Sequence, residues 1–309
     1  MTPSWFDHAP VLVAETVEIL RSVPSGVVVD ATLGGAGHAA ALLEAAPHLR
    51  LIGIDQDRLA REAAAARLER FGERAHVVDG RFDALNQLLD SAGVDHISGF
   101  LFDLGVSSPQ LDHPERGFSF RNDGPLDMRM NRSSQLTAET IVNTWSEDRL
   151  AGLIRTGGDE RFAHRIAKAI VAARPLHRTV ELAEVVVEAI PAATRRTGGH
   201  PAKRTFQALR IAVNDELSIL EPALEAALQR LEPRGRGVVL TYHSGEDRIV
   251  KAVFRRNSMS TTPVHLPVPE EPAPFRLLRP ISRTAGDLEQ QTNPRSRSAR
   301  LRAIERVAA

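Results

Sequence analysis

Apolar and polar positions along the first hundred residues follow two alternating patterns. Short β-branched or continuously apolar runs predict strands at Val27–Asp30, Leu51–Asp55, Ala75–Asp79 and Ile97–Asp103. Alanine- and leucine-rich segments between them predict helices at His38–Ala46, Arg58–Phe71 and Asp83–Ser91. Strands that alternate with helices at this spacing form a parallel sheet with right-handed crossovers, and near-continuous apolar strands indicate that both sheet faces are covered. We therefore expect a doubly wound, mostly parallel α/β fold.

This rhythm is interrupted in the middle of the chain. Leu104–Asn131 is rich in glycine and proline and predicts a loop, whereas Thr137–Pro201 shows only helical periodicity. Apolar steps of three and four residues from Phe206 to Leu231 predict a long buried helix face, which Pro222 should split into two helices. The pattern of the middle segment therefore predicts an inserted all-helical domain.

The α/β pattern returns near the C-terminus. A strand is expected at Val238–Tyr242, a helix at Glu246–Arg255, and a hairpin that pairs Phe275–Arg279 with Arg300–Val307. These elements predict one domain built from residues 1–110 and 211–309, interrupted by the helical insertion at 111–210.

Composition narrows the classes of function. The 309 residues are 42% hydrophobic and 25% charged, close to the average of soluble globular proteins. They contain no apolar run long enough for a transmembrane helix, and the N-terminus has no secretory signal pattern. A net charge of zero excludes a histone-like cationic binder, although all but three of the 39 cationic residues are arginine. Cysteine is absent, which excludes disulfides, thiolate metal sites and a cysteine nucleophile. We expect a cytoplasmic protein without a metal or a membrane partner.

The glycine-rich turn after the first strand is the first candidate for a cofactor site. In doubly wound sheets, ligands bind at the carboxyl ends of the strands. Gly35-x-Gly37-x-x-Ala40 satisfies the dinucleotide fingerprint, with Asp55 placed to hold a ribose. Asp30 does not belong to that fingerprint, but it suits the cationic amino and sulfonium groups of S-adenosylmethionine. A third interpretation makes Asp30 a helix cap and Asp55 a solvated strand end. The pattern favours the methyl donor over the dinucleotide and leaves all three open.

Two further strand ends add candidate residues. Phe82 follows the third strand, where it could stack on an adenine or fill the core. Asp103 ends the fourth strand and precedes Ser107-Ser-Pro-Gln110, where an acceptor nitrogen would meet the donor. Hydrogen-bond acceptors such as Asp103 can hold the N–H groups of an exocyclic base amine and localise its lone pair toward a methyl group.

Several long motifs in fixed order resemble the RsmH (MraW) family over nearly the whole chain. They are Asp103-Leu-Gly-Val-Ser-Ser-Pro-Gln110, Glu115-Arg-Gly-Phe-Ser-Phe120, Asp123-Gly-Pro-Leu-Asp-Met-Arg-Met130, His200-Pro-Ala-Lys-Arg-Thr-Phe-Gln-Ala-Leu-Arg210, His243-Ser-Gly-Glu-Asp-Arg-Ile-Val-Lys251 and Asn293-Pro-Arg-Ser-Arg-Ser298. Members of that family are bacterial methyltransferases that modify N4 of a cytidine in the decoding region of 16S ribosomal RNA.

The resemblance implies a class I S-adenosylmethionine methyltransferase fold with the insertion as substrate domain. It also implies 16S ribosomal RNA, within a small-subunit particle, as partner. It implies donor contacts at Ala36, Gly37, His38, Asp55, Phe82, Asp103 and Gln110. The chain departs from the family at Ala36, where members commonly carry glycine. Asp103 has two open roles, as a donor contact or as the residue that holds the cytosine amine. A DNA amino-methyltransferase, a non-catalytic ribosome-assembly factor and a dinucleotide oxidoreductase are the rival functions.

Other residues are candidates for contact with RNA, each beside an ordinary structural role. Met128, Arg129 and Met130 either pack on the insertion or form a wall that faces RNA. His243 is either a core histidine or a substrate contact. Basic residues gather in a turn and in the C-terminal tail, where they could follow a phosphate backbone. They are Arg195, Arg196, His200, Lys203 and Arg204 in the turn and Arg295, Arg297, Arg300, Arg302 and Arg306 in the tail.

Overall fold

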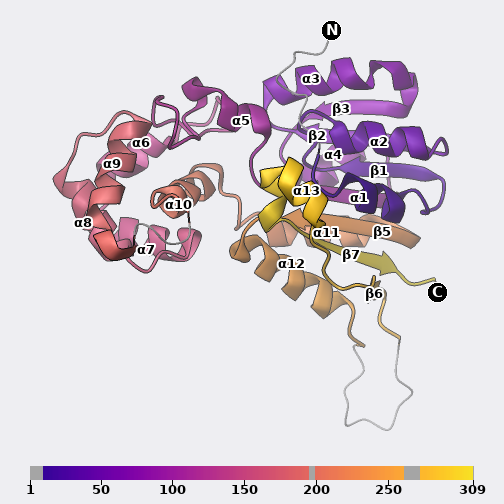
Figure 1. The fold of residues 1–309 in the computed structure, drawn as a ribbon. Coiled ribbons are helices and arrows are strands. Elements are labelled where there is room, and N and C mark those ends of the chain that lie inside the picture. The colour runs from indigo at the N-terminus through magenta and orange to yellow at the C-terminus, as the bar shows by residue number, and fades with distance from the viewer. Residues whose placement is uncertain (1–9, 195–198, 261–271, 309) are drawn as a thin grey trace. The chain divides into compact units, whose positions relative to one another are not determined.

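A computed structural model describes residues 10–194, 199–260 and 272–308 of the chain (Figure 1). The chain divides into two compact units, one of Met1–Gly105 with Leu217–Ala309 and one of Val106–Glu216. We call them the sheet unit and the helical unit. The boundaries lie after residues 105 and 216, whereas the sequence pattern predicts them after residues 110 and 210.

The sheet unit contains one seven-stranded sheet. Its strands are β1 Gly26–Asp30, β2 Leu49–Asp55, β3 Ala75–Asp79, β4 Ile97–Asp103, β5 Leu231–Thr241, β6 Phe275–Leu277 and β7 Arg300–Arg306. They are arranged in the order β3-β2-β1-β4-β5-β7-β6. The first five strands are mutually parallel, and β7 runs antiparallel to β5 and β6. This order confirms the predicted doubly wound, mostly parallel sheet of the class I methyltransferase type and the predicted terminal hairpin.

Helices cover both faces of this sheet, as the apolar strands require (Figure 1). Their bounds are α1 Val13–Leu20, α2 Gly37–Ala45, α3 Arg58–Leu68, α4 Leu85–Ser91, α11 Leu220–Arg230, α12 Ser244–Asn257 and α13 Asp287–Thr292. Successive side chains of a strand point to opposite faces. In β1, Val29 joins the core under α4, α11 and α12, whereas Val28 packs with α1 and α2 on the other face. The chain order reverses between β1 and β4, which is where doubly wound sheets bind ligands.

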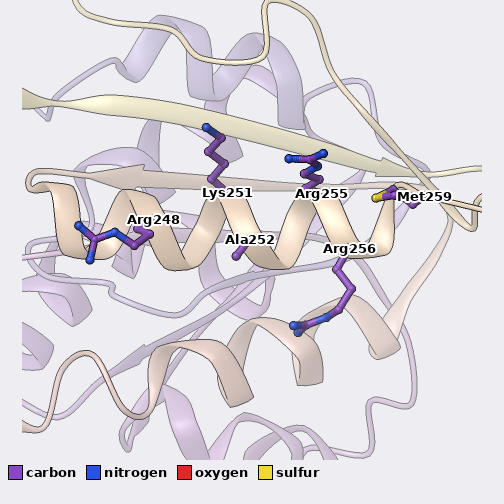
Figure 2. A pocket seen from close by; sticks show the side chains of 6 residues that line it. All are labelled: Arg248, Lys251, Ala252, Arg255, Arg256 and Met259. Carbon is purple, nitrogen blue, oxygen red and sulfur yellow. The ribbon is translucent and has the colours of Figure 1, made fainter.

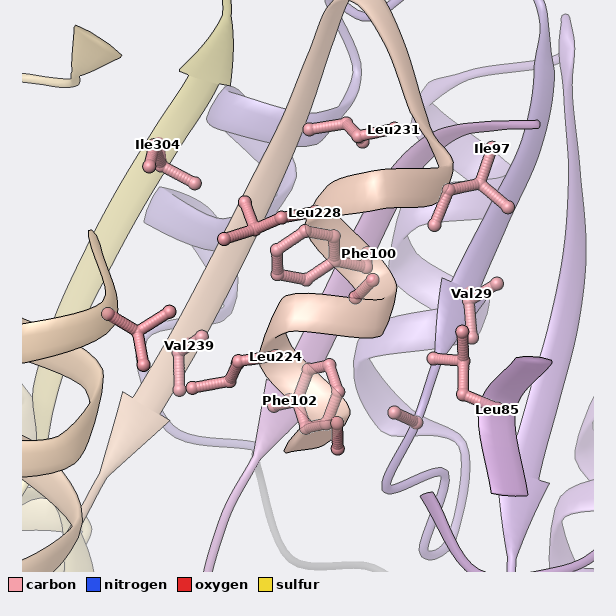
Figure 3. Packing of buried hydrophobic residues seen from close by; sticks show 14 of the residues in the cluster. Val29, Leu85, Ile97, Phe100, Phe102, Leu224, Leu228, Leu231, Val239 and Ile304 are labelled. Carbon is pink, nitrogen blue, oxygen red and sulfur yellow. The ribbon is translucent and has the colours of Figure 1, made fainter. Parts of the chain in front are cut away.

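The larger core lies on the face covered by α4, α11 and α12. Phe100 and Phe102 of β4 are fully buried there, with ring centroids 5.8 Å apart in an edge-to-face arrangement (Figure 3). Leu224 and Leu228 of α11, the helix that lies against this face, belong to the same cluster (Figure 3). A Cβ atom added at Gly237 of the neighbouring strand β5 would come within 2.0 Å of the Phe100 ring. The ring therefore fits only because residue 237 has no side chain.

The described part of the helical unit contains helices and short 3-10 turns. Its α-helices are α5 Ser108–Asp112, α6 Ala138–Thr144, α7 Glu147–Gly158, α8 Ala163–Ala172, α9 Thr179–Ala189 and α10 Lys203–Asn214. Thr137 and Ser146 cap α6 and α7 with their hydroxyl oxygens. The unit has a separate hydrophobic core, in which Ile141, Ile154 and Ile166 are fully buried. The expectation of an inserted all-helical segment is confirmed for these residues.

Three local predictions are wrong. The long apolar segment does form two helices, but Pro222 does not mark the break: the first helix ends at Asn214, and Asp215 adopts a left-handed conformation with φ 55°. Pro222 lies in the first turn of α11, where a missing N–H costs no helical hydrogen bond. The fifth strand begins at Leu231 rather than Val238. The loop predicted at Leu104–Asn131 contains α5 and a 3-10 turn at Pro114–Arg116.

No helix in the described ranges is long and apolar enough to cross a membrane.

Truncation of Phe100 should destabilise the sheet unit. Phe100→Ala removes a fully buried ring and leaves a cavity over Gly237, so we expect the free energy of unfolding to fall by about 3–5 kcal/mol. Leu288→Ala is the control, because the Leu288 side chain is 76% exposed and should change stability by less than about 0.5 kcal/mol. Urea unfolding followed by circular dichroism measures both. Equal effects of the two variants would contradict this packing.

Candidate functional site

The loop after β1 is tied to the ends of both neighbouring strands. The Leu33 N–H donates to the Ile54 carbonyl at the end of β2, and the Ala31 N–H donates to the Leu101 carbonyl of β4. Ala36 is the N-cap residue of α2 and has a left-handed conformation, with φ 57° and no exposed surface. These bonds fix the loop backbone at the point where β1 and β4 diverge. A ligand bound at this edge of the sheet would therefore meet main-chain atoms in fixed positions.

Gly37 and Gly53 allow close packing at the loop after β1, because neither has a side chain. A Cβ atom at Gly37 would lie 2.3 Å from Cγ of Pro10, and one at Gly53 would lie 2.6 Å from a methyl group of Leu33. Both distances are far below van der Waals contact. The structure therefore gives a packing reason for Gly37, in addition to the donor contact that the family resemblance implies.

Asp30 ends β1 as a buried carboxyl group. Its side chain is 2% exposed, and Oδ1 accepts a hydrogen bond from the Thr32 N–H at 3.2 Å. Burial raises the pKa of Asp30 to about 8, and the negative charges of Asp103 and Asp55 add to that rise. A positively charged ligand group beside Asp30 would remove this penalty. The site therefore fits the amino and sulfonium groups of S-adenosylmethionine.

Asp55 ends β2 and accepts two backbone hydrogen bonds. Its Oδ2 accepts from the Gly34 N–H and its Oδ1 from the Asp57 N–H, both at 2.8 Å. Burial raises the pKa of Asp55 to about 6, although the two hydrogen bonds oppose that rise. Each carboxylate oxygen has a second acceptor position, so Asp55 can also take the two hydroxyl groups of a ribose. Asp55 is thus a bound part of the loop, and the alternative interpretation of Asp55 as a solvated strand end is wrong.

Asp103 ends β4 and is the centre of a hydrogen-bond network. Its backbone N–H donates to Oγ1 of Thr32 at 2.6 Å, and its Oδ1 accepts from the Tyr242 hydroxyl at 2.7 Å. Its Oδ2 lies 3.5 Å from Nδ1 of His38. Burial raises the pKa of Asp103, while His38 and the hydrogen bond from Tyr242 oppose that rise. Burial and the charge of Asp103 also raise the pKa of Tyr242.

His38 is held in one orientation by the main chain. Its Nε2 lies 2.8 Å from the Val11 carbonyl, which can only accept, so Nε2 carries a proton. Nδ1 of the neutral ring then directs a lone pair toward Asp103, and a favourable contact needs one more proton on either group. His38 and Asp103 therefore form a pair arranged to share one proton at the carboxyl edge of the sheet.

Tyr242, Thr32 and Val11 belong to this network and were missed by the sequence reasoning. Tyr242 is the only tyrosine of the chain and ends the predicted fifth strand, so its position offered a signal. The carbonyl of Val11 offered none, because a backbone contact across 27 residues leaves no trace in residue type.

Phe82 and Gln110, two further predicted donor contacts, lie in different units of the chain. Phe82 lies in a 3-10 turn after β3 and packs edge-to-face on Phe102, with ring centroids 5.6 Å apart. It contributes to the core while staying partly exposed, so its adenine contact remains a prediction. Gln110 is buried in the helical unit, where its Oε1 accepts from the Ser107 N–H. Its donor contact also remains a prediction.

Among the candidates for RNA contact, some residues have structural roles and others are exposed. Met128 is fully buried in the helical core, so it cannot form an RNA-facing wall. Arg129 binds both oxygens of Asp127. In the basic turn, Lys203 is exposed and His200 stacks on Phe120 with ring centroids 4.5 Å apart. Arg195 and Arg196 lie outside the described residues.

Arg302 and His243 are both bound to neighbouring residues of the fold. Arg302 of β7 is buried and binds both oxygens of Asp247, so it is not available to a phosphate backbone. His243 precedes α12, and its Nδ1 accepts from the Glu246 N–H at 3.4 Å. Within the described ranges, no three potential ligand side chains are grouped to hold a metal ion.

Comparison with known proteins gives consistent matches along the chain. The model of the MraW methylase family matches residues 5–307. A relative from Thermobifida fusca is 52% identical over 97% of this chain and 93% of its own length. A relative from Geobacter sulfurreducens is 51% identical over 98% of this chain and 99% of its own. Both are named ribosomal RNA small subunit methyltransferase H. A solved rRNA methylase from Streptococcus thermophilus is 12% identical, covers 97% of this chain and 99% of its own, and has a TM-score of 0.45.

Neutralising Asp30 should flatten the dependence of stability on pH. The carboxyl loses its proton near pH 3.8 in an unfolded chain but near pH 8 in the folded one. The folded protein therefore holds an extra proton between these values, and its stability falls as the pH rises. Asp30→Asn should keep the acceptor for Thr32 and raise the stability at pH 8 by roughly 1–3 kcal/mol relative to wild type.

Thermal unfolding between pH 5 and pH 8 measures this effect without any ligand. Asp79→Asn is the matched control, because Asp79 ends the adjacent β3 but its side chain is 72% exposed. An unchanged pH profile in Asp30→Asn would show that Asp30 is already ionised in the folded protein.

Proposed function

The chain belongs to the MraW methylase family, and on that premise we propose that it methylates N4 of a cytidine in the decoding region of 16S ribosomal RNA. Its methyl donor is S-adenosylmethionine. The proposal of an RNA substrate rests on the 52% identity, over nearly the full length of both chains, to a small-subunit ribosomal RNA methyltransferase. The cytoplasm, where such an RNA is found in bacteria, stays the predicted location.

The residues at the carboxyl edge fit the donor. When bound, S-adenosylmethionine supplies an electrophilic methyl group on a positively charged sulfur. Asp30 would face the cationic part of the donor, and the carboxylate of Asp55 would accept from the ribose hydroxyls. The loop backbone near Ala36 and Gly37 would line the bound molecule, and Phe82 would contact its adenine. These residues belong to the sheet unit, whereas Gln110, whose donor contact also remains a prediction, belongs to the helical unit.

Asp103 is the residue that we assign to the target amine. An exocyclic amine has N–H groups that need an acceptor, and it must lose one proton when its nitrogen gains a methyl group. Oδ2 of Asp103 can accept that N–H, while Oδ1 is held by Tyr242. A proton that arrives on Oδ2 would be shared with Nδ1 of His38, 3.5 Å away. The raised pKa of Asp103 makes it a better proton acceptor than an exposed aspartate.

The helical unit is proposed to bind the RNA around the target. It presents the exposed Lys203 beside the stacked rings of Phe120 and His200. Flat rings next to cations are typical of surfaces that bind single-stranded nucleic acid, because bases stack on the rings and phosphates pair with the cations. Unpaired RNA of the decoding region would offer both bases that stack on the rings and phosphates that pair with the cations.

Mass spectrometry of ribosomal RNA nucleosides tests the proposed reaction. A deletion strain should lack N4-methylated cytidine in 16S ribosomal RNA, and expression of this chain should restore it. The purified protein should also methylate small-subunit particles from that strain when S-adenosylmethionine is added. Full N4 methylation in the deletion strain, or restoration at another base or in DNA, would overturn the proposal.

Asp103→Asn tests the role of the carboxylate. This variant keeps the shape but replaces one acceptor oxygen with a donor, so turnover should fall by about 100-fold at saturating donor and RNA. Donor affinity, measured by calorimetry, should change much less. A raised Michaelis constant for the donor with normal turnover would instead assign Asp103 to donor binding alone.

Tyr242→Phe is the companion variant, because it removes only the hydroxyl that holds Asp103. The hydrogen bond from Tyr242 lowers the pKa of Asp103, so its loss raises that pKa further. The acidic limb of the turnover–pH profile should therefore move to higher pH.

A further inference from the structure

A row of cations lies on the outer side of α12. Arg248, Lys251 and Arg255 are exposed and follow one another at helical spacing; we call them the α12 basic face. They line an open cavity of about 660 Å³ together with Ala252, Arg256 and Met259. Figure 2 shows Lys251 and Arg255 side by side on one side of the helix, with Arg256 on the opposite side.

The acidic side chains near this face are bound to other groups. Arg256 extends toward α11 and pairs there with Glu221 and Glu225. Asp247 of α12 itself pairs with Arg302 of β7. Glu305 of β7 pairs with Arg236 and Arg276. Within residues 10–194, 199–260 and 272–308, no carboxylate pairs with the three cations of the α12 basic face. The face therefore has three positive charges that the described fold does not neutralise.

Helix stability does not account for this arrangement. Cations stabilise a helix near its C-terminus, where they interact with the macrodipole, and Arg255 is placed to do so. Arg248 and Lys251 lie in the second and third turns, where that interaction is absent. Like charges at neighbouring helical positions also repel one another. Arg248 and Lys251 therefore lower the stability of the isolated protein, which favours a role for them in binding an anion.

The spacing and the surroundings point to a nucleic-acid backbone. Seven residues of helix separate Arg248 from Arg255, a rise of about 10 Å. That length allows the three cations to reach neighbouring phosphates of one strand. A membrane-surface helix would need an exposed apolar face beside its cations. The apolar residues Val250, Val253 and Phe254 of α12 are instead buried in the core of the sheet unit.

We propose that the α12 basic face is a docking surface for the phosphate backbone of the substrate RNA, outside the target nucleotide. The inference rests on the proposed function. α12 begins two residues after Tyr242, whose hydroxyl contacts Asp103. The helix then leads away from the carboxyl edge of the sheet, as a helix after a parallel strand does. RNA that continues from a base held at Asp103 would therefore pass along the α12 basic face.

The triple variant Arg248→Gln, Lys251→Gln, Arg255→Gln tests the proposal in the full chain. Fluorescence anisotropy should follow binding of a 16S ribosomal RNA fragment and of an unrelated RNA of equal length over a range of salt concentrations. We expect affinity to fall by at least about tenfold for both RNAs and the log–log salt slope to become shallower by about 2. Donor affinity and turnover at saturating RNA should stay at the wild-type level.

Two controls separate this effect from a change in fold or in net charge. Arg248→Lys with Arg255→Lys keeps all three charges and should keep the salt slope of the wild type. Arg70→Gln removes one exposed arginine that pairs with Glu44 on another helix, and it should leave RNA binding unchanged.

The possible outcomes distinguish this inference from the proposed function. If the wild type methylates 16S ribosomal RNA and the triple variant keeps its affinity and salt slope, the docking surface is overturned and the function stands. If the triple variant loses binding to vesicles of anionic lipid while RNA binding is unchanged, the face belongs to a membrane and the inference is also overturned. If the wild type binds RNA through this face but methylates no ribosomal RNA, the proposed function fails and the docking surface is supported.

Discussion

At the edge of the sheet where the strand order reverses, the negative charges of Asp103 and Asp55 both repel that of Asp30. Asp30, Asp55 and Asp103 end β1, β2 and β4, and burial raises the pKa of each. The folded chain tolerates this arrangement because hydrogen bonds hold each group in place. A cationic ligand at this edge would make ionisation of all three favourable. This edge therefore suits a positively charged ligand, as proposed for the donor, and it lowers the stability of the fold when no such ligand is bound.

The hydrophobic packing of the strands maintains this edge. Parallel strands place their carboxyl ends together only if the register is fixed, and the burial of Phe100 and Phe102 against α11 fixes it for β4. Gly53 admits Leu33, so the loop after β1 lies against β2 and brings Gly34 to Asp55. Core packing and the chemistry of the site are thus parts of one arrangement. A change in the register of β4 would move Asp103 away from Tyr242 and His38.

Local pattern was sufficient to predict the elements that lie at strand ends. Asp30, Asp55 and Asp103 could be placed because each follows a short apolar run, and the chain order of a doubly wound fold brings such ends together. Contacts between distant segments could not be predicted in the same way. The Tyr242–Asp103 hydrogen bond joins residues 139 positions apart. Pro222 was misplaced because proline is tolerated in the first turn of a helix, which the pattern of apolar steps does not reveal. Met128 shows that an apolar residue in a glycine-rich loop can belong to a core.

The distribution of charge reconciles a net charge of zero with binding to a polyanion. The acidic residues nearest to α12, among them Asp247, Glu221 and Glu225, form ion pairs, and Asp30, Asp55 and Asp103 end strands at the carboxyl edge. The cations of the α12 basic face have no such partners among the described residues, so the field outside α12 is positive although the chain is neutral overall. Local charge rather than total charge steers a ligand within a Debye length of a surface. Under the proposed function, a chain of zero net charge can therefore attract RNA to one face while the carboxylates proposed to hold its donor remain shielded by burial.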